Sequence, residues 1–167
     1  MLALPASYAD VLAEVIVPGF TALPSEMDTP EARLIVLATG GVETQFRTRE
    51  QDGHPAGGAN GLFQMQYNCV LDVMHNKASG NLVWNLCGVL GVTYGSNAIF
   101  DALLTNDELA ACMTRLAYWC DPRPLPQVGD MMGAWDTYER VQRPGKPSHS
   151  RWKQCYPQAL TALQGAA

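Results

Sequence analysis

The stretch Ala32–Gln66, ARLIVLATGGVETQFRTREQDGHPAGGANGLFQMQ, decides the fold that we expect for this chain. Between Arg33 and Glu43 it carries no charge, and its apolar residues cover a broad helical surface, which predicts a buried helix. Thr29 fits the N-cap of this helix, and Pro30 fits its first turn, where a missing N–H costs nothing. We therefore expect a central buried helix that ends at one acid, Glu43.

Glu43 is the first candidate for a catalytic group. A carboxyl at an apolar helix end is poorly solvated, which raises its pKa and keeps a proton available near neutral pH. A lone glutamate near a helix end is more often an ordinary exposed residue, so the interpretation depends on its neighbours. Gly40 and Gly41 have two interpretations: they weaken the helix end, or they make room beside Glu43 for a sugar or another backbone.

A glycine-rich segment follows, and its glycines are Gly53, Gly57, Gly58 and Gly61. Glycines let a backbone approach a ligand closely. The apolar spacing after them predicts a helix over residues 61–76, on which Gln64 and Tyr67 share a face. Both side chains are candidates for lining a groove that begins at Glu43.

These motifs, in this order, resemble the lytic transglycosylase and goose-type lysozyme group of the lysozyme-like superfamily. In that group an apolar helix ends in Glu-Ser, and a loop leads to Gly-Ala-x-Gly-Leu-Met-Gln. This chain has Glu43-Thr44 and then Gly58-Ala59-Asn60-Gly61-Leu62-Phe63-Gln64, with threonine for the serine, phenylalanine for the methionine, and a longer loop. The resemblance implies a mainly α, lysozyme-like single domain with little or no β structure, a central buried helix and a glycine-rich active-site loop.

A third cluster is Ala134-Trp135-Asp136, which is similar to the Ala-Tyr-Asn triplet on the far groove wall of lytic transglycosylases. The resemblance implies that Trp135 or Tyr138 offers a flat face to a pyranose ring and that Asp136 accepts sugar hydroxyls. The alternative is an amphipathic helix with Met132, Trp135 and Tyr138 in the core. With this cluster the resemblance extends from about Ala32 to Trp152, and its closing stretch is typical of bacteriophage-encoded members.

The resemblance implies a peptidoglycan-degrading enzyme that uses one carboxyl and no metal or cofactor. Glu43 would protonate the β-1,4 glycosidic oxygen between N-acetylmuramic acid and N-acetylglucosamine and then act as base, giving a 1,6-anhydro sugar or, with water, a lysozyme product. Two-carboxylate schemes need a second acid, for which Glu50 and Asp52 are the nearest candidates. Because neither is an obvious partner, we favour the transglycosylase product. The implied substrate-binding residues are Thr44, Gly61, Phe63, Gln64, Tyr67, Trp135, Asp136 and Tyr138.

The composition of the 167 residues, 47% hydrophobic and 16% charged, predicts one folded domain. We expect residues 1–28 to form an N-terminal helix and connector, and residues 29–167 to form the catalytic-type core. The net charge of −5 offers no basic face for nucleic acid and would not steer in an anionic wall polymer. Recognition would then depend on short-range hydrogen bonds and stacking.

The cysteines and the N-terminus indicate synthesis in a reducing cytoplasm. Five cysteines without a CxxC pair predict free thiols rather than a zinc site or a disulfide framework. We expect no signal peptide, since Pro5 and Asp10 interrupt the apolar segment, and no membrane span. A wall-active protein of this kind would reach the periplasm inside a phage virion, as a tail component, or as an endolysin through a holin pore. The competing hypothesis is a catalytically silent lysozyme-like part of a phage tail or baseplate.

The other helices have clear start and stop signals. Ser7 is expected to cap a first helix that Pro18 and Gly19 end. Thr105 and Glu108 form an expected capping box for a further helix. Short helices joined by tight turns should fill residues 82–105, and an aromatic in this apolar block, such as Trp84 or Tyr94, lies in the core or faces the groove. The proline-rich residues 121–126 should form an extended connector, which is either a rigid linker or a ligand for a docking protein. Ser148 should cap the last helix.

Overall fold

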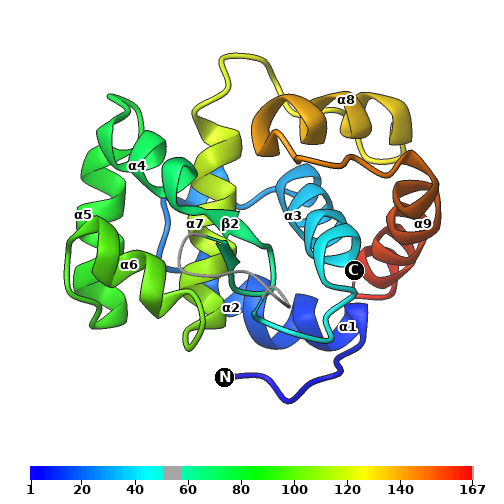
Figure 1. Cartoon of the computed structure of the whole chain (residues 1–167). Coiled ribbons are helices and arrows are strands. Elements are labelled where there is room, and N and C mark those ends of the chain that lie inside the picture. Colours follow the sequence, from blue (N-terminus) through cyan, green and yellow to red (C-terminus); the bar gives the residue numbers. More distant parts are fainter. Residues whose placement is uncertain (51–57, 167) are drawn as a thin grey trace.

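The structure, a computed structural model, describes residues 1–50 and 58–166. The chain is 62% helix and 3% strand, which confirms the mainly α fold. The elements are α1 (Tyr8–Val11), η1 (Leu12–Ile16), α2 (Val17–Phe20), η2 (Ser25–Met27), α3 (Pro30–Glu43), β1 (Ala59–Asn60), β2 (Met65–Gln66), α4 (Tyr67–His75), α5 (Gly80–Leu90), α6 (Ser96–Ala102), α7 (Asp107–Trp119), α8 (Met131–Gln142) and α9 (His149–Gly165). In Figure 1, α4, α5 and α6 lie on one side of α7, and α8 and α9 lie on the other side beside α3.

The N-terminal helix continues beyond the proline that was expected to end it. Ser7 caps it as expected: its Oγ accepts the N–H of Asp10 at 3.1 Å, and the Asp10 carboxylate accepts the N–H of Ser7 at 3.1 Å. Before Pro18 the helix widens into the π-helical η1, and it then runs through α2 to Phe20. A proline ring inside an α-helix clashes with the carbonyl four residues back, and the wider π turn relieves that clash.

The central helix α3 forms as the sequence predicted. The Thr29 Oγ1 accepts the N–H of Ala32 at 3.2 Å, and Pro30 is the first helical residue. From Leu34 to Val42 the helix is buried throughout, mainly against α9, η1 and α7. After Glu43 the chain turns away because Gln45 and Phe46 both adopt left-handed backbone angles, with φ of 51° and 53°.

Gly40 and Gly41 serve close packing of aromatic rings, which neither interpretation of the sequence included. A Cβ on Gly40 would collide with the ring of Phe46 and approach the Phe63 ring at 3.0 Å. A Cβ on Gly41 would collide with the Tyr8 hydroxyl. The two glycines therefore let buried rings lie directly on the backbone of α3, next to the turn that carries Glu43.

We expect Gly40→Ala to destabilise the protein by about 1–3 kcal/mol, because the cost of overpacking exceeds the gain in helix propensity. The matched control is Gly88→Ala in α5, where no atom lies within 4 Å of the added Cβ. That change should stabilise the protein by about 0.5–1 kcal/mol. Urea unfolding of both variants measures the difference, and equal effects of the same sign would contradict this account.

Residues 61–66 form a turn and a strand, so the expected helix over residues 61–76 begins only at Tyr67. Strands β1 and β2 pair antiparallel, with Ala59 opposite Gln66. Gly61 and Gln64 have φ of 79° and 48°, which no right-handed helix can contain. Gln64 and Tyr67 are therefore not on one helical face, and that prediction was wrong.

One hydrophobic core joins the N-terminal helices to the rest of the described chain. It contains Val11, Ile16 and Phe20 together with α3, α7 and the aromatic residues of α8 and α9. Helix α7 begins one residue later than predicted, since Asn106 rather than Thr105 caps it, by accepting the N–H of Leu109 at 2.9 Å. Ser148 caps α9 as expected. All five cysteines are free, as expected, and the described residues include no helix long and apolar enough to cross a membrane.

Candidate active site

A cleft of about 610 Å³ opens beside the end of α3. Its walls come from the end of α3, the β1–β2 turn, the last turns of α8 and the segment that leads into α9. The described residues that line it are Val42, Glu43, Gly58, Ala59, Gln64, Gln66, Tyr138, Gln142, Pro144, Gly145, Lys146, Ser148 and Arg151. Glu43 is the one carboxylic acid in this set.

Glu43 is half-buried at the floor of the cleft, and its environment tunes its proton affinity. The Tyr138 hydroxyl donates a hydrogen bond of 2.6 Å to its Oε1. Burial raises the pKa of Glu43, while the Tyr138 hydrogen bond and the charge of Arg151 partly offset that rise. A protonated Glu43 would carry its proton on Oε2, because Oε1 accepts from Tyr138. The group suits both proton donation and later stabilisation as a carboxylate.

Thr44 joins the helix end to the turn opposite it. Its side chain is buried, and its Oγ1 donates to the carbonyl of Leu62 at 2.8 Å and accepts the N–H of Phe46 at 3.1 Å. This bridge sets the position of Glu43 relative to Gln64. Thr44 was a candidate substrate-binding residue, but the structure places it behind the cleft, where it positions the residues on either side.

Gln64 lies on the cleft as the sequence predicted. Its Nε2 donates to the carbonyls of Gly61, at 2.9 Å, and Arg49, at 3.3 Å, which fixes the side chain. Gly61 does not line the cleft. It packs instead against the chain at Leu103, whose carbonyl oxygen would lie 2.7 Å from a Cβ on Gly61. Its role in the structure is the turn and the close approach of two backbones.

Tyr138 lies on the cleft beside Glu43, but four other substrate-binding candidates lie away from it. Phe63 is 1% exposed and packs in the core behind α3. Tyr67 points toward α6, where its hydroxyl bonds the Ser96 hydroxyl at 2.9 Å and its ring packs on Phe100. Trp135 lies in the aromatic core, as the alternative interpretation of the third cluster predicted, but Met132, which that interpretation also placed in the core, is 49% exposed. Asp136 is exposed outside the cleft. Successive residues of an α-helix point in different directions around its axis, so Ala134, Trp135 and Asp136 do not all face the cleft.

A cluster of aromatic rings behind the cleft holds the Tyr138 ring in position. The Tyr138 ring stacks on Trp152 with centroids 5.1 Å apart, and Trp135 packs against both rings. Burial and the neighbouring Glu43 carboxylate both raise the pKa of Tyr138, so its hydroxyl stays protonated and available as a donor. Of the three aromatic and acidic candidates in this helix, Tyr138 is the one brought to Glu43.

Several cleft residues were missed at the level of the sequence. They are Gln66, Gln142, Lys146, Ser148 and Arg151. One available signal was charge clustering, since five of the 11 basic residues, Arg140, Arg143, Lys146, Arg151 and Lys153, fall within 14 positions. Arg151 also donates to the carbonyl of Val42 at 3.1 Å, so a cation is held next to Glu43.

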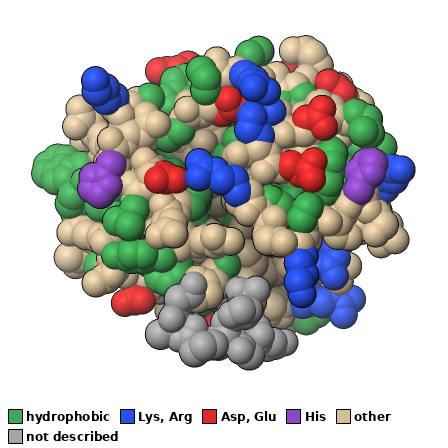
Figure 2. Space-filling view, turned by 45° about the horizontal axis from the view of Figure 1, so that its top comes forward, with side chains coloured by type: hydrophobic (Ala, Val, Ile, Leu, Met, Phe, Trp, Pro, Cys, Tyr) green, Lys and Arg blue, Asp and Glu red, His purple; other side chains and the backbone are tan. Residues whose placement is uncertain are grey.

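The charge around the cleft differs from the charge of the whole molecule. On the face drawn in Figure 2, acidic and basic side chains are interspersed, in keeping with a surface that has no broad basic patch on that side. Among the described residues that line the cleft, Lys146 and Arg151 face a single acid, Glu43. An anionic ligand therefore gains local attraction there that the net charge of −5 does not suggest.

The remaining functional candidates do not reach the cleft. Glu50 is exposed and does not line it, while Asp52, Gly53 and Gly57 lie outside the described residues. Trp84 and Tyr94 are neither in the core nor on the cleft: they are 63% and 46% exposed. Groups of three or more residues suited to a metal ion do not occur in the described part of the chain. Comparison of the chain with protein-family models, curated proteins and solved structures gives no match.

We expect Tyr138→Phe to lower the rate of any reaction that uses Glu43 as an acid by about tenfold, the worth of one hydrogen bond to a charged group. The change also removes a contact that lowers the pKa of Glu43, so the alkaline limb of the pH–rate profile should move to higher pH. Tyr156→Phe is the matched control, because its hydroxyl contacts Gly129 away from the cleft. An alkaline limb that stays in place or moves to lower pH would contradict the role of Tyr138.

Proposed function

We propose that the chain is a peptidoglycan-degrading enzyme that cleaves the β-1,4 bond between N-acetylmuramic acid and N-acetylglucosamine, as lytic transglycosylases and lysozymes do. The observation that carries this proposal is the half-buried carboxyl of Glu43, with a raised pKa and a hydrogen bond from Tyr138, on a cleft of about 610 Å³. The motifs around Glu43 and Gln64 support the lysozyme-like assignment, and both residues line this cleft.

In the proposed reaction Glu43 protonates the glycosidic oxygen from Oε2 while the bond to the anomeric carbon breaks. The N-acetyl group of the muramic ring stabilises the oxocarbenium-like centre, because the described cleft offers no second carboxylate. Tyr138 and Arg151 stabilise the carboxylate that Glu43 becomes. Glu43 then removes a proton from the C6 hydroxyl, which gives a 1,6-anhydro product, or from water. Because no second acid occurs among the described residues of the cleft, we favour the first outcome.

The cations of the cleft fit this substrate. Muramic acid carries a lactyl carboxylate, and its peptide branch adds further carboxylates. Lys146 and Arg151 offer two positive charges on the wall beside Glu43. Charge-assisted hydrogen bonds of this kind are stronger than neutral ones, so short-range attraction offsets the unfavourable net charge of the protein.

The competing proposal is a catalytically silent structural part of a phage tail or baseplate. One observation favours it: residues 78–100 contain no charged residue and expose Trp84, Val89 and Tyr94 by 63%, 67% and 46%. Exposed apolar side chains on an uncharged surface are typical of protein contacts. Enzymatic and docking roles are compatible in a virion-associated protein, which would carry its activity to the periplasm.

The test is incubation of the purified protein with peptidoglycan sacculi and mass analysis of the soluble fragments. An anhydro product is lighter by one water than the hydrolysed product, so one measurement separates transglycosylase from lysozyme. Turbidity loss of chloroform-treated Gram-negative cells gives a second readout. If neither substrate is affected by the unmodified protein, the enzymatic proposal is wrong and the structural one stands. Detection of the protein in purified virions distinguishes a tail component from an endolysin.

A further inference from the structure

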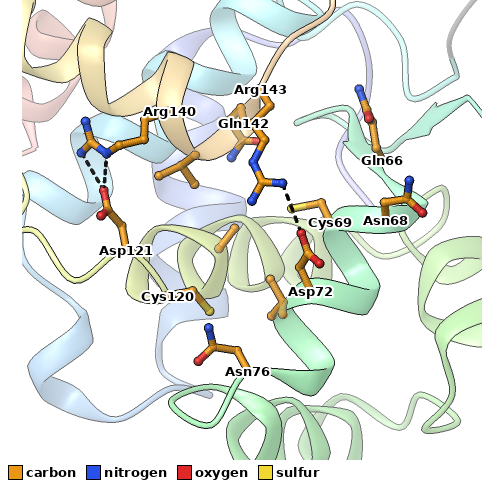
Figure 3. A pocket seen from close by; sticks show the side chains of 13 residues that line it. Gln66, Asn68, Cys69, Asp72, Asn76, Cys120, Asp121, Arg140, Gln142 and Arg143 are labelled. Atoms are coloured by element: carbon orange, nitrogen blue, oxygen red, sulfur yellow. Dashed lines mark hydrogen bonds and ion pairs between the residues drawn. The ribbon is translucent and has the colours of Figure 1, made fainter.

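A second cavity, of about 590 Å³, adjoins the Glu43 cleft and has no part in the chemistry described above. It lies between α4, the end of α7 and the end of α8 (Figure 3). Gln66 and Gln142 line both the cavity and the cleft, so the two spaces are neighbours that share these two side chains. The second cavity is therefore next to the cleft that holds Glu43.

Two ion pairs line this cavity, and in one of them the arginine is already fully engaged in hydrogen bonds within the protein. The Arg140 Nε and Nη2 donate to Asp121 Oδ2 at 2.8 and 2.6 Å. The same guanidinium also donates to the Asp136 carbonyl and the Thr137 hydroxyl, both at 3.2 Å. Figure 3 shows this pair at one side of the cavity, joining α8 to the end of α7. Arg140 is thus committed to holding the two helices together.

The second ion pair is long and exposed to solvent. Arg143, the left-handed C-cap of α8, reaches toward Asp72 on α4, as Figure 3 shows, with Nη1 and Oδ2 3.5 Å apart. Their side chains are 75% and 62% exposed, and such pairs contribute little stability. Both groups therefore remain able to bind other charges, and they stand side by side with opposite sign at the rim of a polar cavity.

The rest of the cavity is neutral and rich in amides. Gln66, Asn68 and Asn76 contribute carboxamides to its lining. Cys69 and Cys120 also line it, and burial and the nearby Asp72 raise the pKa of Cys69 to about 11, so that thiol is uncharged at neutral pH. The charges that can bind a ligand are thus one cation, Arg143, and one anion, Asp72. They lie next to carboxamides that can hydrogen-bond the N–H and C=O groups of peptide bonds.

We propose that this second cavity binds a short peptide branch through an amino-acid zwitterion, in which an ammonium and a carboxylate share one carbon. The carboxylate displaces Asp72 from Arg143, the ammonium binds Asp72, and the amide side chains bond the peptide backbone. This inference rests on the proposed function, because the polymer cleaved at Glu43 carries peptide branches. Because Gln66 and Gln142 line both spaces, the cavity lies next to the place where a sugar would bind at Glu43, within reach of a branch on that sugar.

Binding is tested without cleavage, by isothermal titration and NMR titration of the Glu43→Gln protein. The probe is meso-diaminopimelate, whose two ends are such zwitterions; acetate and methylamine, each with one charge, are the ligand controls. We expect Arg143→Ala and Asp72→Ala to weaken probe binding by at least about tenfold. Arg47→Ala, at an exposed arginine outside both spaces, should leave it unchanged. Equal binding by all variants, equal binding of acetate, or no binding of the probe would overturn the proposal.

A second readout compares two substrates of the unmodified protein. Sacculi with intact peptides should be cleaved faster than glycan stripped of peptides by an amidase, and Arg143→Ala should remove that preference while still cleaving the stripped glycan. Equal cleavage of both substrates by the unmodified protein would count against the peptide subsite. Probe binding without any cleavage would leave the subsite standing and refute the proposed enzymatic function, so the two failures are distinguishable.

Discussion

Glu43→Gln should lower the rate of glycan cleavage by about 10² to 10⁴. The amide has the size of the carboxyl and can still accept the Tyr138 hydrogen bond, but it has no proton to donate. We expect the fall mainly in kcat, because the amide still fills its place in the cleft. Release of soluble fragments from sacculi measures the rate, and Glu14→Gln, at an exposed acid of η1, is the control.

The same variant should be more stable than the unmodified protein at neutral pH. A loss of activity in this variant would then come from the missing acid and not from unfolding. The pKa of Glu43 is raised in the folded chain, so its ionised form costs stability as the pH rises above its unfolded value of about 4.3. Glutamine never ionises, and the difference in melting temperature should vanish below about pH 4. Full activity in a folded Glu43→Gln protein would refute Glu43 as the acid.

Asp107→Asn should destabilise the protein by about 3–5 kcal/mol, the usual cost of removing one partner from a buried ion pair. Asp107 is 3% exposed and accepts from Arg49 Nε and Nη2, both at 2.7 Å, and from the N–H of Leu2 at 2.8 Å. It therefore ties the N-terminal segment and the chain before the glycine-rich segment to the start of α7. The free energy of unfolding from urea titration measures the effect.

The effect of Asp107→Asn should reach the cleft as well. The Arg49 carbonyl accepts the N–H of Gly61 at 2.8 Å and the Nε2 of Gln64 at 3.3 Å, so a loosened Arg49 releases Gln64. We expect kcat/KM to fall although Glu43 is intact. Asp72→Asn is the matched control for stability, because its exposed pair with Arg143 should contribute less than about 1 kcal/mol. Equal destabilisation by both changes would mean that burial of the Asp107 pair has no special role.

The proposed docking role and the proposed catalytic role would depend on different parts of the chain. The cleft uses α3, the β1–β2 turn and the segment before α9, whereas the exposed Trp84, Val89 and Tyr94 belong to α5 and the turn that follows it. A virion component could therefore bind its neighbours through one surface and the glycan through the other. Substitutions at Trp84 should leave cleavage of sacculi unchanged if the two roles are independent.

The sequence by itself determined the helices and most of their ends. Caps at Ser7, Thr29 and Ser148 and the uncharged run before Glu43 act over a few residues, so their outcome can be predicted from neighbours alone. The same local chemistry placed Glu43 at the poorly solvated end of a buried helix. The mainly α fold follows from these elements.

Only the tertiary structure decided which side chains meet at Glu43. The left-handed angles of Gly61 and Gln64 turned an expected helix into a turn and strand, and moved Tyr67 from the groove to α6. Core packing took Phe63 and Trp135 inside and brought Tyr138, from 95 residues away, onto the carboxyl. A residue's direction depends on which distant element fills the space beside it, and contacts between remote segments carry no signal in the local pattern of one sequence.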